Sequence, residues 1–280
     1  MFSNLRSLIF KLDPETAHGL AIKSLKFNFV PNVLDKNKNS HLFKTKLFEK
    51  EIENPIGMAA GFDKNAEVYN SLFKLGFGFV EVGTITPLKQ YGNPKPRVFR
   101  LVEDEALINR LGFNNRGMHY VSRKIKAYKG NGKIGINVGA NKNSSDRISD
   151  FVKVLTLNAQ NVDFITVNVS SPNTVGLRDL QRFRDLNQLV LSIMQSEVMI
   201  AHKKPILIKV APDLNNQELK SIVKVCKKYK ISGIIATNTT IQRPQFKGSY
   251  KDKAGGLSGK PLFDISNSTL AKLYYLSDGK

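Results

Sequence analysis

The sequence predicts an α/β fold, a (β/α)8 barrel of the TIM type that follows an N-terminal pair of helices. Two observations lead to this class. Short apolar runs alternate with helical segments six times, and small polar residues follow most of these runs. Strands that are separated by helices run parallel, and a barrel binds its ligand at their carboxyl ends. A closed barrel needs eight units, so we expect only about six of the eight, with the C-terminal end lacking.

Residues 1–40 are expected to form an amphipathic helical appendage, and residues 41–280 the incomplete barrel. The apolar residues at helical spacing in the first segment are Leu5, Leu8, Ile9 and Leu12. Asp13 followed by Pro14 is typical of a helix start, and Pro31 should end this second helix. Basic residues lie between the apolar ones, so the pair could rest on a membrane interface or pack on the barrel.

Composition narrows the possible classes of protein. The net charge is +20 over 280 residues, from lysines that are scattered along the chain. This charge favours anionic partners, although most of these lysines could simply form a solvated surface. A single cysteine excludes a disulfide framework, and no apolar run is long enough to span a membrane. No basic-aromatic RNA-binding motif and no metal-ligand spacing occur, so neither nucleic acid nor metal is expected.

The barrel elements follow in order, each strand being a short run rich in apolar or β-branched residues. The predicted strands span residues 55–60, 77–84, 133–138, 164–169, 205–210 and 231–237. A helix at about 146–160 follows the third strand, one at about 186–200 follows the fourth, and one that begins at Asn215 follows the fifth. A final helix begins near Asp264. Between the second strand and its helix, residues 96–101 and 106–110 flank an acidic turn, which predicts a hairpin over the carboxyl end of the sheet. Residues 255–259, rich in glycine, are expected to be a flexible loop whose amides could face an anion.

The stretch from Asp163 to Arg178 is the most informative for the site, because an apolar strand there ends in a polar Ser-Ser-Pro-Asn turn. Ser171 and Asn173 could bind a polar planar ligand, or could only shape the turn. The polar residues at strand ends and in the hairpin are Lys64, Thr84, Asn109, Asn137, Asn168, Ser171, Asn173, Lys209, Thr237, Asn238 and Thr239. Amides suit the edge of a pyrimidine or an isoalloxazine ring, and lysines suit an anion. The four histidines lie outside this set, which argues against a histidine triad.

Eight sequence runs give a family resemblance: NPIGMAAGFDKN, GFVEVGTITP, GNPKPRVFRL, INRLGFNN, VNVSSPNTVGLR, IKVAPDL, TNTT and GGLSGKPL. Together they resemble the dihydroorotate dehydrogenases of the quinone-dependent, membrane-associated class, class 2, over nearly the whole chain. The resemblance implies oxidation of dihydroorotate to orotate in de novo pyrimidine biosynthesis. It also implies FMN as the hydride acceptor and a quinone as the final electron acceptor.

The resemblance assigns roles to individual residues. The FMN-binding residues it implies are Ala60, Gly61, Phe62, Asp63, Lys64, Thr84, Asn137, Asn168, Lys209, Thr237 and Gly259. The substrate-binding residues it implies are Lys64, Asn109, Arg110, Leu111, Gly112, Phe113, Asn168, Asn173, Asn238 and Thr239. Ser171, the serine before proline, would be the base that removes the C5 proton. The only cysteine, Cys226, lies away from every motif, as the serine class requires.

The family also places a quinone tunnel between the N-terminal helices and the barrel. Its implied lining is Leu5, Leu8, Ile9, Leu12, His18 and Arg97, with Arg100 as an alternative to Arg97. The chain would then lie peripherally on anionic lipid, at the cytoplasmic face of a bacterial inner membrane. The family's glycine-rich phosphate segment is not among these residues, so we expect weak FMN retention and exposed edges at the first and sixth strands. The alternatives are another flavin barrel, such as a tRNA-dihydrouridine synthase, an inactive truncated fragment, or a basic binding module.

Overall fold

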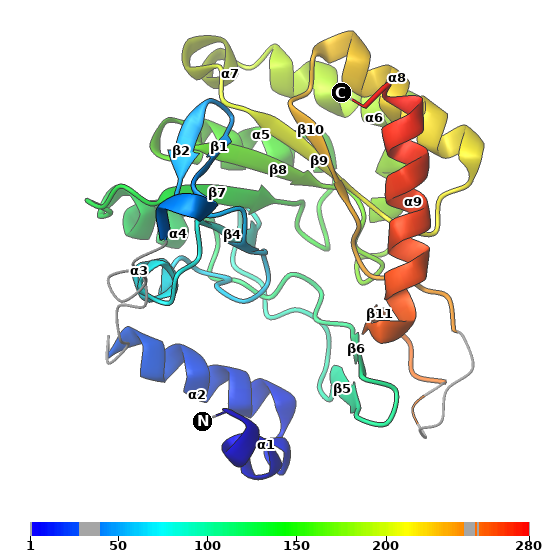
Figure 1. Ribbon diagram of the computed structural model, residues 1–280. Helices are drawn as coiled ribbons and strands as arrows, with labels where there is room; N and C mark the ends of the chain where they lie inside the picture. Colours follow the sequence, from blue (N-terminus) through cyan, green and yellow to red (C-terminus); the bar gives the residue numbers. More distant parts are fainter. Residues whose placement is uncertain (1, 28–39, 244–249, 251, 280) are drawn as a thin grey trace.

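The structure is a computed structural model that describes residues 2–27, 40–243, 250 and 252–279. Its centre is a curled parallel sheet of six strands in the order β10-β9-β8-β7-β4-β3 (Figure 1). The strands are β3 (Gly57–Met58), β4 (Phe79–Ile85), β7 (Lys133–Val138), β8 (Phe164–Asn168), β9 (Ile206–Val210) and β10 (Gly233–Ala236). This confirms the six predicted parallel strands. The register sets Asn168 beside Lys209, so side chains from neighbouring strand ends meet at one edge.

The first strand is shorter than predicted. Residues 55–60 were expected to be extended, but only Gly57 and Met58 pair with β4. Beyond them the chain turns, and Gly61 has a φ of +110°, which a strand does not allow. The amide of Gly61 donates instead to the carbonyl of Gly83 at 2.9 Å. This turn brings the backbone of residues 60–64 across the end of the sheet.

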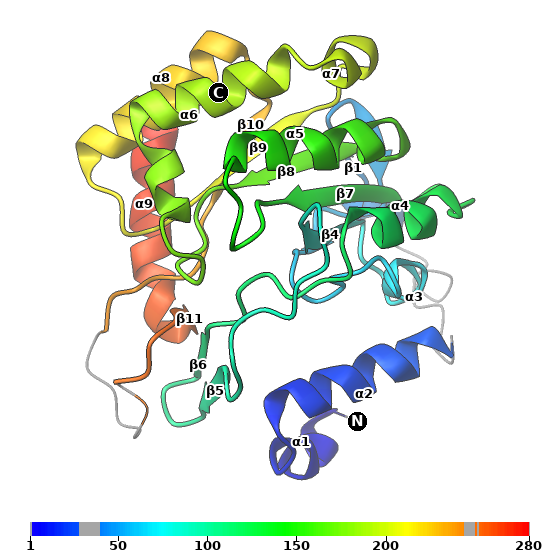
Figure 2. The ribbon, with the colours of Figure 1, turned by 180° about the vertical axis from the view of Figure 1, so that it is seen from behind.

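Helices cover the outer face of the sheet, with α5, α6 and α8 side by side (Figure 2). The helices of this part are α3 (Tyr69–Lys74), α4 (Met118–Lys126), α5 (Arg147–Asn158), α6 (Phe183–Met194), α7 (Glu197–His202), α8 (Asn216–Tyr229) and α9 (Phe263–Leu276). Short 3-10 turns are η2 (Ser40–Phe43), η3 (Ala159–Asn161), η4 (Leu177–Gln181) and η5 (Lys260–Leu262). Phe151 of α5 and Leu186 of α6 are fully buried against the sheet. Asn215 caps α8 in a reciprocal pair with Glu218.

The single helix predicted for residues 186–200 is wrong, because α6 and α7 are separate. The hydroxyl of Ser196 donates to the carbonyl of Ile193 at 2.6 Å, and Ser196 has an extended backbone with ψ of 138°. A serine that bonds to a carbonyl of the preceding turn competes with the helical hydrogen bond and favours a break. The apolar spacing continues across this break, which explains the wrong prediction.

A small antiparallel sheet lies apart from the central one. It joins β5 (Val98–Leu101) and β6 (Ala106–Asn109), which confirms the predicted hairpin, to β11 (Gly256–Gly259). The flexible loop predicted for residues 255–259 is therefore wrong. Leu257 is buried in a second small core, and its amide donates to the carbonyl of Thr240 at 2.8 Å, so it does not face an anion. The strand packs so closely on its neighbours that a Cβ on Gly256 would lie 1.9 Å from Thr239 Oγ1, so glycine is required at this position.

The N-terminal helices are α1 (Phe2–Phe10) and α2 (Pro14–Lys26), and they lie beside the β5–β6 hairpin (Figure 1). Asp13 caps α2 as predicted, accepting from the amide of Thr16 at 2.9 Å. Pro31 lies outside the described residues. A hairpin of β1 (Thr45–Leu47) and β2 (Lys50–Ile52) was not predicted. Within the part of the chain described here, no helix combines the length and the apolar character needed to span a bilayer.

Candidate active site

The carboxyl ends of the central strands and the small sheet enclose a cavity of about 390 Å³. Fifteen of the expected site residues line it: Ala60, Gly61, Lys64, Thr84, Asn109, Leu111, Gly112, Phe113, Asn168, Ser171, Asn173, Lys209, Thr237, Asn238 and Thr239. Residues that are far apart in the sequence therefore share one wall. Five expected residues, Phe62, Asp63, Arg110, Asn137 and Gly259, are not part of this lining.

A buried carboxylate begins a chain of hydrogen bonds that leads to the cavity. Glu81 of β4 accepts from Asn137 Nδ2 at 2.7 Å, which leaves Asn137 Oδ1 as the acceptor for its other neighbours. That oxygen accepts from Thr84 Oγ1 at 2.5 Å and from Asn168 Nδ2 at 3.0 Å. Because a carboxylate only accepts, Glu81 fixes which end of each amide points in which direction. Asn137 therefore supports the cavity from behind.

The amide of Asn168 passes this orientation on to the serine turn. Its Oδ1 accepts from the hydroxyl of Ser170 at 3.1 Å, and Asn238 Nδ2 donates to the same hydroxyl at 3.0 Å. Ser170 is completely buried in this network. Ser171 lines the cavity instead, and its Oγ accepts from the amide of Asn173 at 3.3 Å. A ligand in the cavity could therefore contact the hydroxyl of Ser171, whereas the hydroxyl of Ser170 is buried behind the cavity wall.

Two lysines, carried by different strand ends, line the cavity. Lys209 projects from β9, and Lys64 follows the turn after β3, where its Nζ donates to the carbonyl of Gly61. Burial lowers the pKa of Lys64 to about 8, and the positive charge of Arg97 acts in the same direction, against Glu15. An anion in the cavity would favour the charged form of this lysine.

Two of the expected residues outside the lining, Asp63 and Arg110, use their side chains to hold the backbone of nearby turns. Asp63 is buried and accepts from the amides of Glu67 and Val68, each at 2.8 Å. Burial raises the pKa of Asp63, and these hydrogen bonds oppose the rise. Asp63 therefore holds the turn that carries Gly61 and Lys64. The guanidinium of Arg110 donates to the carbonyl of Pro96 at 2.8 Å. Gly259 ends β11.

Arg97, expected near the quinone, joins the helix pair to the hairpin. Its Nε and Nη2 bind the carboxylate of Glu15 at 2.9 and 2.8 Å, while Nη1 donates to the carbonyls of Tyr91 and Asn93. Its side chain is only 7% exposed. Arg100 donates to the carbonyl of Leu12 at 2.8 Å. Arg97, directly before β5, and Arg100, within β5, therefore hold the helix pair in place.

His18 of α2 lies between the helix pair and the turn after β3. Its Nε2 lies 2.9 Å from the carbonyl of Phe62, so this nitrogen carries a hydrogen, and the two rings meet edge to face. Burial lowers the pKa of His18, and the charge of Lys64 lowers it further, so the neutral ring is favoured. Leu8 is 62% exposed and Leu12 is 39% exposed. The side chain of Leu5 lies outside the described part of the structure.

Sequence reasoning missed two groups of residues. The first group lines the cavity and consists of Gly83, Val98, Leu107, Asn114, Ser258 and Leu262. The second group supports the cavity and consists of Glu81, Arg178 and Asp213. A glutamate inside the apolar strand Phe79–Ile85 was a usable signal, because a charge in a buried strand requires partners. Ser258 had no comparable signal, since its place depends on the pairing of β11 with β6.

This fold and site define a class of protein. It is an α/β barrel-type enzyme whose cavity is lined by amides, two lysines and the serine of the turn after β8, a set suited to a planar, anionic ligand. The family model described as dihydroorotate dehydrogenase matches residues 42–280. The chain belongs to the dihydroorotate dehydrogenase family.

Named relatives and solved structures agree with this membership. The chain is similar to dihydroorotate dehydrogenase (quinone) of Mesorhizobium japonicum, at 48% identity over 96% of this chain and 75% of the relative. It is also similar to the mitochondrial dihydroorotate dehydrogenase (quinone) of Cyclocybe aegerita, at 45% identity over 96% and 83%. The crystal structure of the Eimeria tenella enzyme in complex with ferulenol superposes with a TM-score of 0.88 at 34% identity, covering 95% of this chain and 78% of that chain.

Proposed function

We propose that this chain is a quinone-linked dihydroorotate dehydrogenase, which oxidises dihydroorotate to orotate in pyrimidine biosynthesis. The convergence of an accessible serine, two lysines and a set of amides on one cavity carries the proposal. A dihydropyrimidine acid presents alternating N–H and C=O groups along its ring, and a carboxylate beside them. Amides can match the first pattern, and a lysine can match the carboxylate.

The cavity fits FMN as the cofactor. Gly61 supports this, because a Cβ placed on it would meet no heavy atom within 4 Å, so a flat ring can approach the backbone there. Thr84, Asn168, Lys209 and Thr237 offer polar groups around that space. Bound FMN would supply the redox chemistry here, as the acceptor of the hydride that leaves C6 of the substrate.

The substrate is held by residues of the hairpin and of the turns after β8 and β10. Asn173 Nδ2 donates to Asn109 Oδ1 at 3.2 Å, an arrangement that leaves Asn109 Nδ2 and Asn173 Oδ1 to bind the substrate ring. Asn238 and Thr239 lie in the same lining. Lys64 in its charged form binds the substrate carboxylate. Leu111, Gly112 and Phe113 close this part of the wall.

Ser171 is the base at C5 of the substrate. Its hydroxyl can take the C5 proton only as its own proton leaves, so the step needs a second acceptor. Among the described residues, the backbone N–H of Asn173 donates to Ser171 Oγ. A donor N–H cannot take the hydroxyl proton. Water in the cavity is therefore the acceptor that we assign to the hydroxyl proton.

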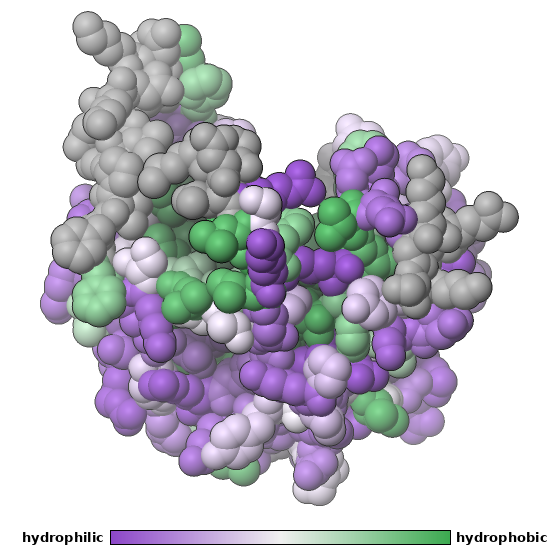
Figure 3. All heavy atoms as spheres, turned by 90° about the horizontal axis from the view of Figure 1, so that it is seen from below, coloured by the Kyte–Doolittle hydropathy of each residue, from purple (hydrophilic) through white to green (hydrophobic). Residues whose placement is uncertain are grey.

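A membrane quinone reaches the site from the side of the helix pair. Apolar residues gather on this face of the molecule, within a largely hydrophilic surface (Figure 3). Leu8 of α1, Leu20 of α2 and Phe27, directly after α2, are exposed. A quinone entering between α2 and β5 would meet His18 and Arg97. The protein would lie on anionic lipid at the cytoplasmic face of a bacterial inner membrane, without crossing it.

The test uses the purified chain supplemented with FMN. Dihydroorotate is added without oxygen, and flavin bleaching and orotate formation are recorded; a short-chain quinone is then added. We expect bleaching, orotate, and recovery of the flavin colour with the quinone. Ser171→Ala should slow orotate formation by at least about 100-fold, the contribution of a positioned base. Ser170→Ala is the matched control, and its smaller effect would separate the two serines.

Two results would overturn parts of this proposal. Bleaching by dihydrouridine but not by dihydroorotate would favour another flavin barrel. Full activity of Ser171→Ala, together with loss of activity in Ser170→Ala, would transfer the role of base to Ser170.

A further inference from the structure

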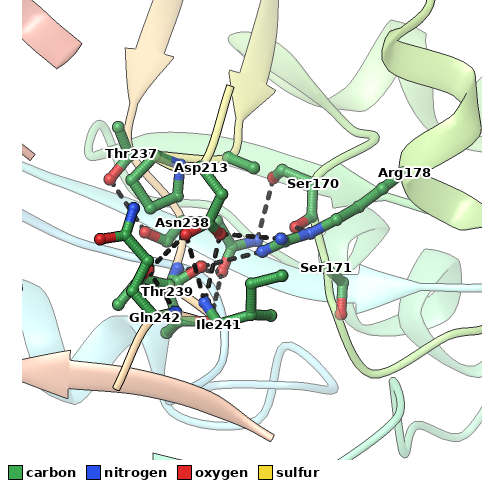
Figure 4. A network of polar contacts seen from close by, with 12 residues as sticks. Ser170, Ser171, Arg178, Asp213, Thr237, Asn238, Thr239, Ile241 and Gln242 are labelled. Atoms are coloured by element: carbon green, nitrogen blue, oxygen red, sulfur yellow. Dashed lines mark hydrogen bonds and ion pairs between the residues drawn. The ribbon is translucent and has the colours of Figure 1, made fainter. Parts of the chain in front are cut away.

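Arg178, in η4, connects three turns at the carboxyl edge of the sheet. Its Nε donates to the carbonyl of Ser170 at 2.9 Å, and its Nη2 donates to the carbonyl of Thr239 at 3.0 Å (Figure 4). Its Nη1 pairs with the carboxylate of Asp213 at 2.8 Å. These three partners follow β8, β10 and β9 respectively. One guanidinium therefore links the serine turn to the two neighbouring strand ends.

Asp213 completes the link from its own side. Its Oδ1 accepts from the hydroxyl of Thr240, and both of its oxygens lie within 3.3 Å of the amide of Ile241. Its side chain is 12% exposed and that of Arg178 is 21% exposed, so the pair is largely shielded from water. The carboxylate thus fixes the turn after β10 independently of Arg178.

Neither residue lines the cavity, but both act on residues that do. The carbonyl of Ser170 belongs to the planar peptide group that ends at the Cα of Ser171. A hydrogen bond to that oxygen restricts the position of Ser171. The carbonyl of Thr239 is held by the same guanidinium, and Thr239 lines the cavity with Asn238. Figure 4 shows Ser171 with its hydroxyl directed away from this network.

We propose that Arg178 is a positioning residue, which together with Asp213 fixes the Ser171 turn relative to the substrate-binding turn of Asn238 and Thr239. This inference rests on the proposed function. Arginine suits the role because its rigid fork serves three acceptors at once, whereas a lysine ammonium that reaches Asp213 cannot also keep both carbonyls in place. A displacement of about 1 Å at a reacting group lowers a rate by about 100-fold.

The main variant is Arg178→Lys, which keeps the charge beside Asp213. Arg182→Lys is the matched control, because Arg182 lies four residues along the chain and pairs with Asp179 on the surface, at 70% and 54% exposure. The measurements are kcat and KM for dihydroorotate, the flavin content, the Tm, and hydrogen exchange of residues 168–175.

For Arg178→Lys we expect kcat to fall by about 10- to 100-fold, while KM changes by less than about threefold. Flavin content and Tm should stay near those of the unchanged protein, and exchange in residues 168–175 should become faster. Arg182→Lys should change none of these quantities. Asp213→Asn should speed exchange in the same segment, which tests the pair even if Arg178→Lys folds poorly.

Unchanged kcat and unchanged exchange in Arg178→Lys would overturn the inference. A parallel loss of flavin, Tm and activity would also overturn it, since that pattern indicates a purely structural role. If the unchanged protein fails to oxidise dihydroorotate, the proposed function fails, whereas the exchange result still reports whether Arg178 holds the serine turn.

Discussion

The orientation of single amides decides what the cavity can bind. Asn137, Asn168 and Asn238 each carry a donor and an acceptor, and an isolated amide could take either orientation. Glu81 removes this freedom, because its carboxylate only accepts hydrogen bonds and lies at the start of the hydrogen-bond network that runs through these amides. The polar pattern at the cavity wall therefore depends on a residue that does not itself line the cavity.

Substitution of Glu81 tests this dependence. Glu81→Leu should lower the free energy of unfolding by about 2 kcal/mol, because it leaves the buried Asn137 amide and Thr166 hydroxyl without their acceptor. It should also weaken orotate binding, as the amides can then rotate. Glu81→Gln retains an acceptor and should cost less in both respects. Urea unfolding and orotate titration measure the two effects, and equal losses in the two variants would contradict this account.

Lys64 should make ligand binding depend on pH. Burial lowers the pKa of Lys64 to about 8, so its ammonium is lost at a lower pH than in an ordinary lysine. Below that pH the charged form binds an anion, and above it the affinity for orotate should fall by up to about tenfold per pH unit. Titration with orotate from pH 6 to pH 10 measures this dependence.

The controls for the pH experiment are two further variants. Lys64→Met should bind orotate weakly and with little change over the same range. Lys95→Met removes an exposed lysine near Glu15 and should leave the pH dependence unchanged. Constant affinity of the unchanged protein up to pH 10 would show that Lys64 does not hold the anion.

Among the elements, α2 is held beside the hairpin by the ion pair of Glu15 with Arg97, while its C-terminal end pairs with Glu67 through Lys26. Arg97 is nearly buried, and Glu15 is 17% exposed. Removing one partner of such a pair leaves a poorly solvated charge, which costs more than the loss of a surface pair. The position of the helix pair should therefore respond strongly to a single substitution.

Glu15→Gln should weaken the attachment of α2 by about 2 kcal/mol, which corresponds to about thirtyfold faster hydrogen exchange in residues 14–26. Glu49→Gln is the control, since its pair with Lys46 is 3.9 Å long and exposed, and should change exchange by less than about threefold. If both variants exchange at the rate of the unchanged protein, the ion pair does not fix the helix.

The elements also show what the sequence could predict. Apolar runs at regular spacing identified the six strands, and Asp13 and Asn215 marked helix starts correctly, because these signals are local. The strand β11 could not be predicted, since Gly256 and Gly259 carry no β propensity and its partner lies far away in the sequence. The β1–β2 hairpin was missed because strands of three residues show almost no alternation.

For the site, the lining was largely predictable and its support was not. Polar residues directly after apolar strands predicted most of the wall, since parallel strands end at the same edge. The roles of Arg178 and Glu81 depend on which turns and strands become neighbours in the fold, and this cannot be derived from the spacing of residues in the sequence. Three-dimensional proximity across β8, β9 and β10 was needed to find them.

At the scale of the whole molecule, charge and apolar surface act together. The chain carries a net charge of +20, and apolar residues gather on the face that carries the helix pair (Figure 3). An anionic bilayer would attract the charge and accept the apolar side chains, and added salt would weaken only the first contribution.

Vesicles that contain phosphatidylglycerol test this combination. Binding should fall as salt rises, and Lys11→Glu with Lys23→Glu should weaken it by more than tenfold, since each lysine near the surface contributes about 1 kcal/mol. Lys220→Glu with Lys272→Glu makes the same change in net charge on α8 and α9, and should have a smaller effect. Equal effects of the two pairs would show that total charge, and not the helix pair, governs binding.

The pairing of β6 with β11 affects how the protein folds while it is being synthesised on the ribosome. Ser258 donates to the carbonyl of Leu107 across a separation of 151 residues. Asn109 is made early, yet the strand beside it is made only near residue 256, so the emerging chain carries an unfinished small sheet for most of its synthesis. The cavity is therefore completed late in translation, and a nascent chain that stops before residue 256 cannot yet enclose a ligand.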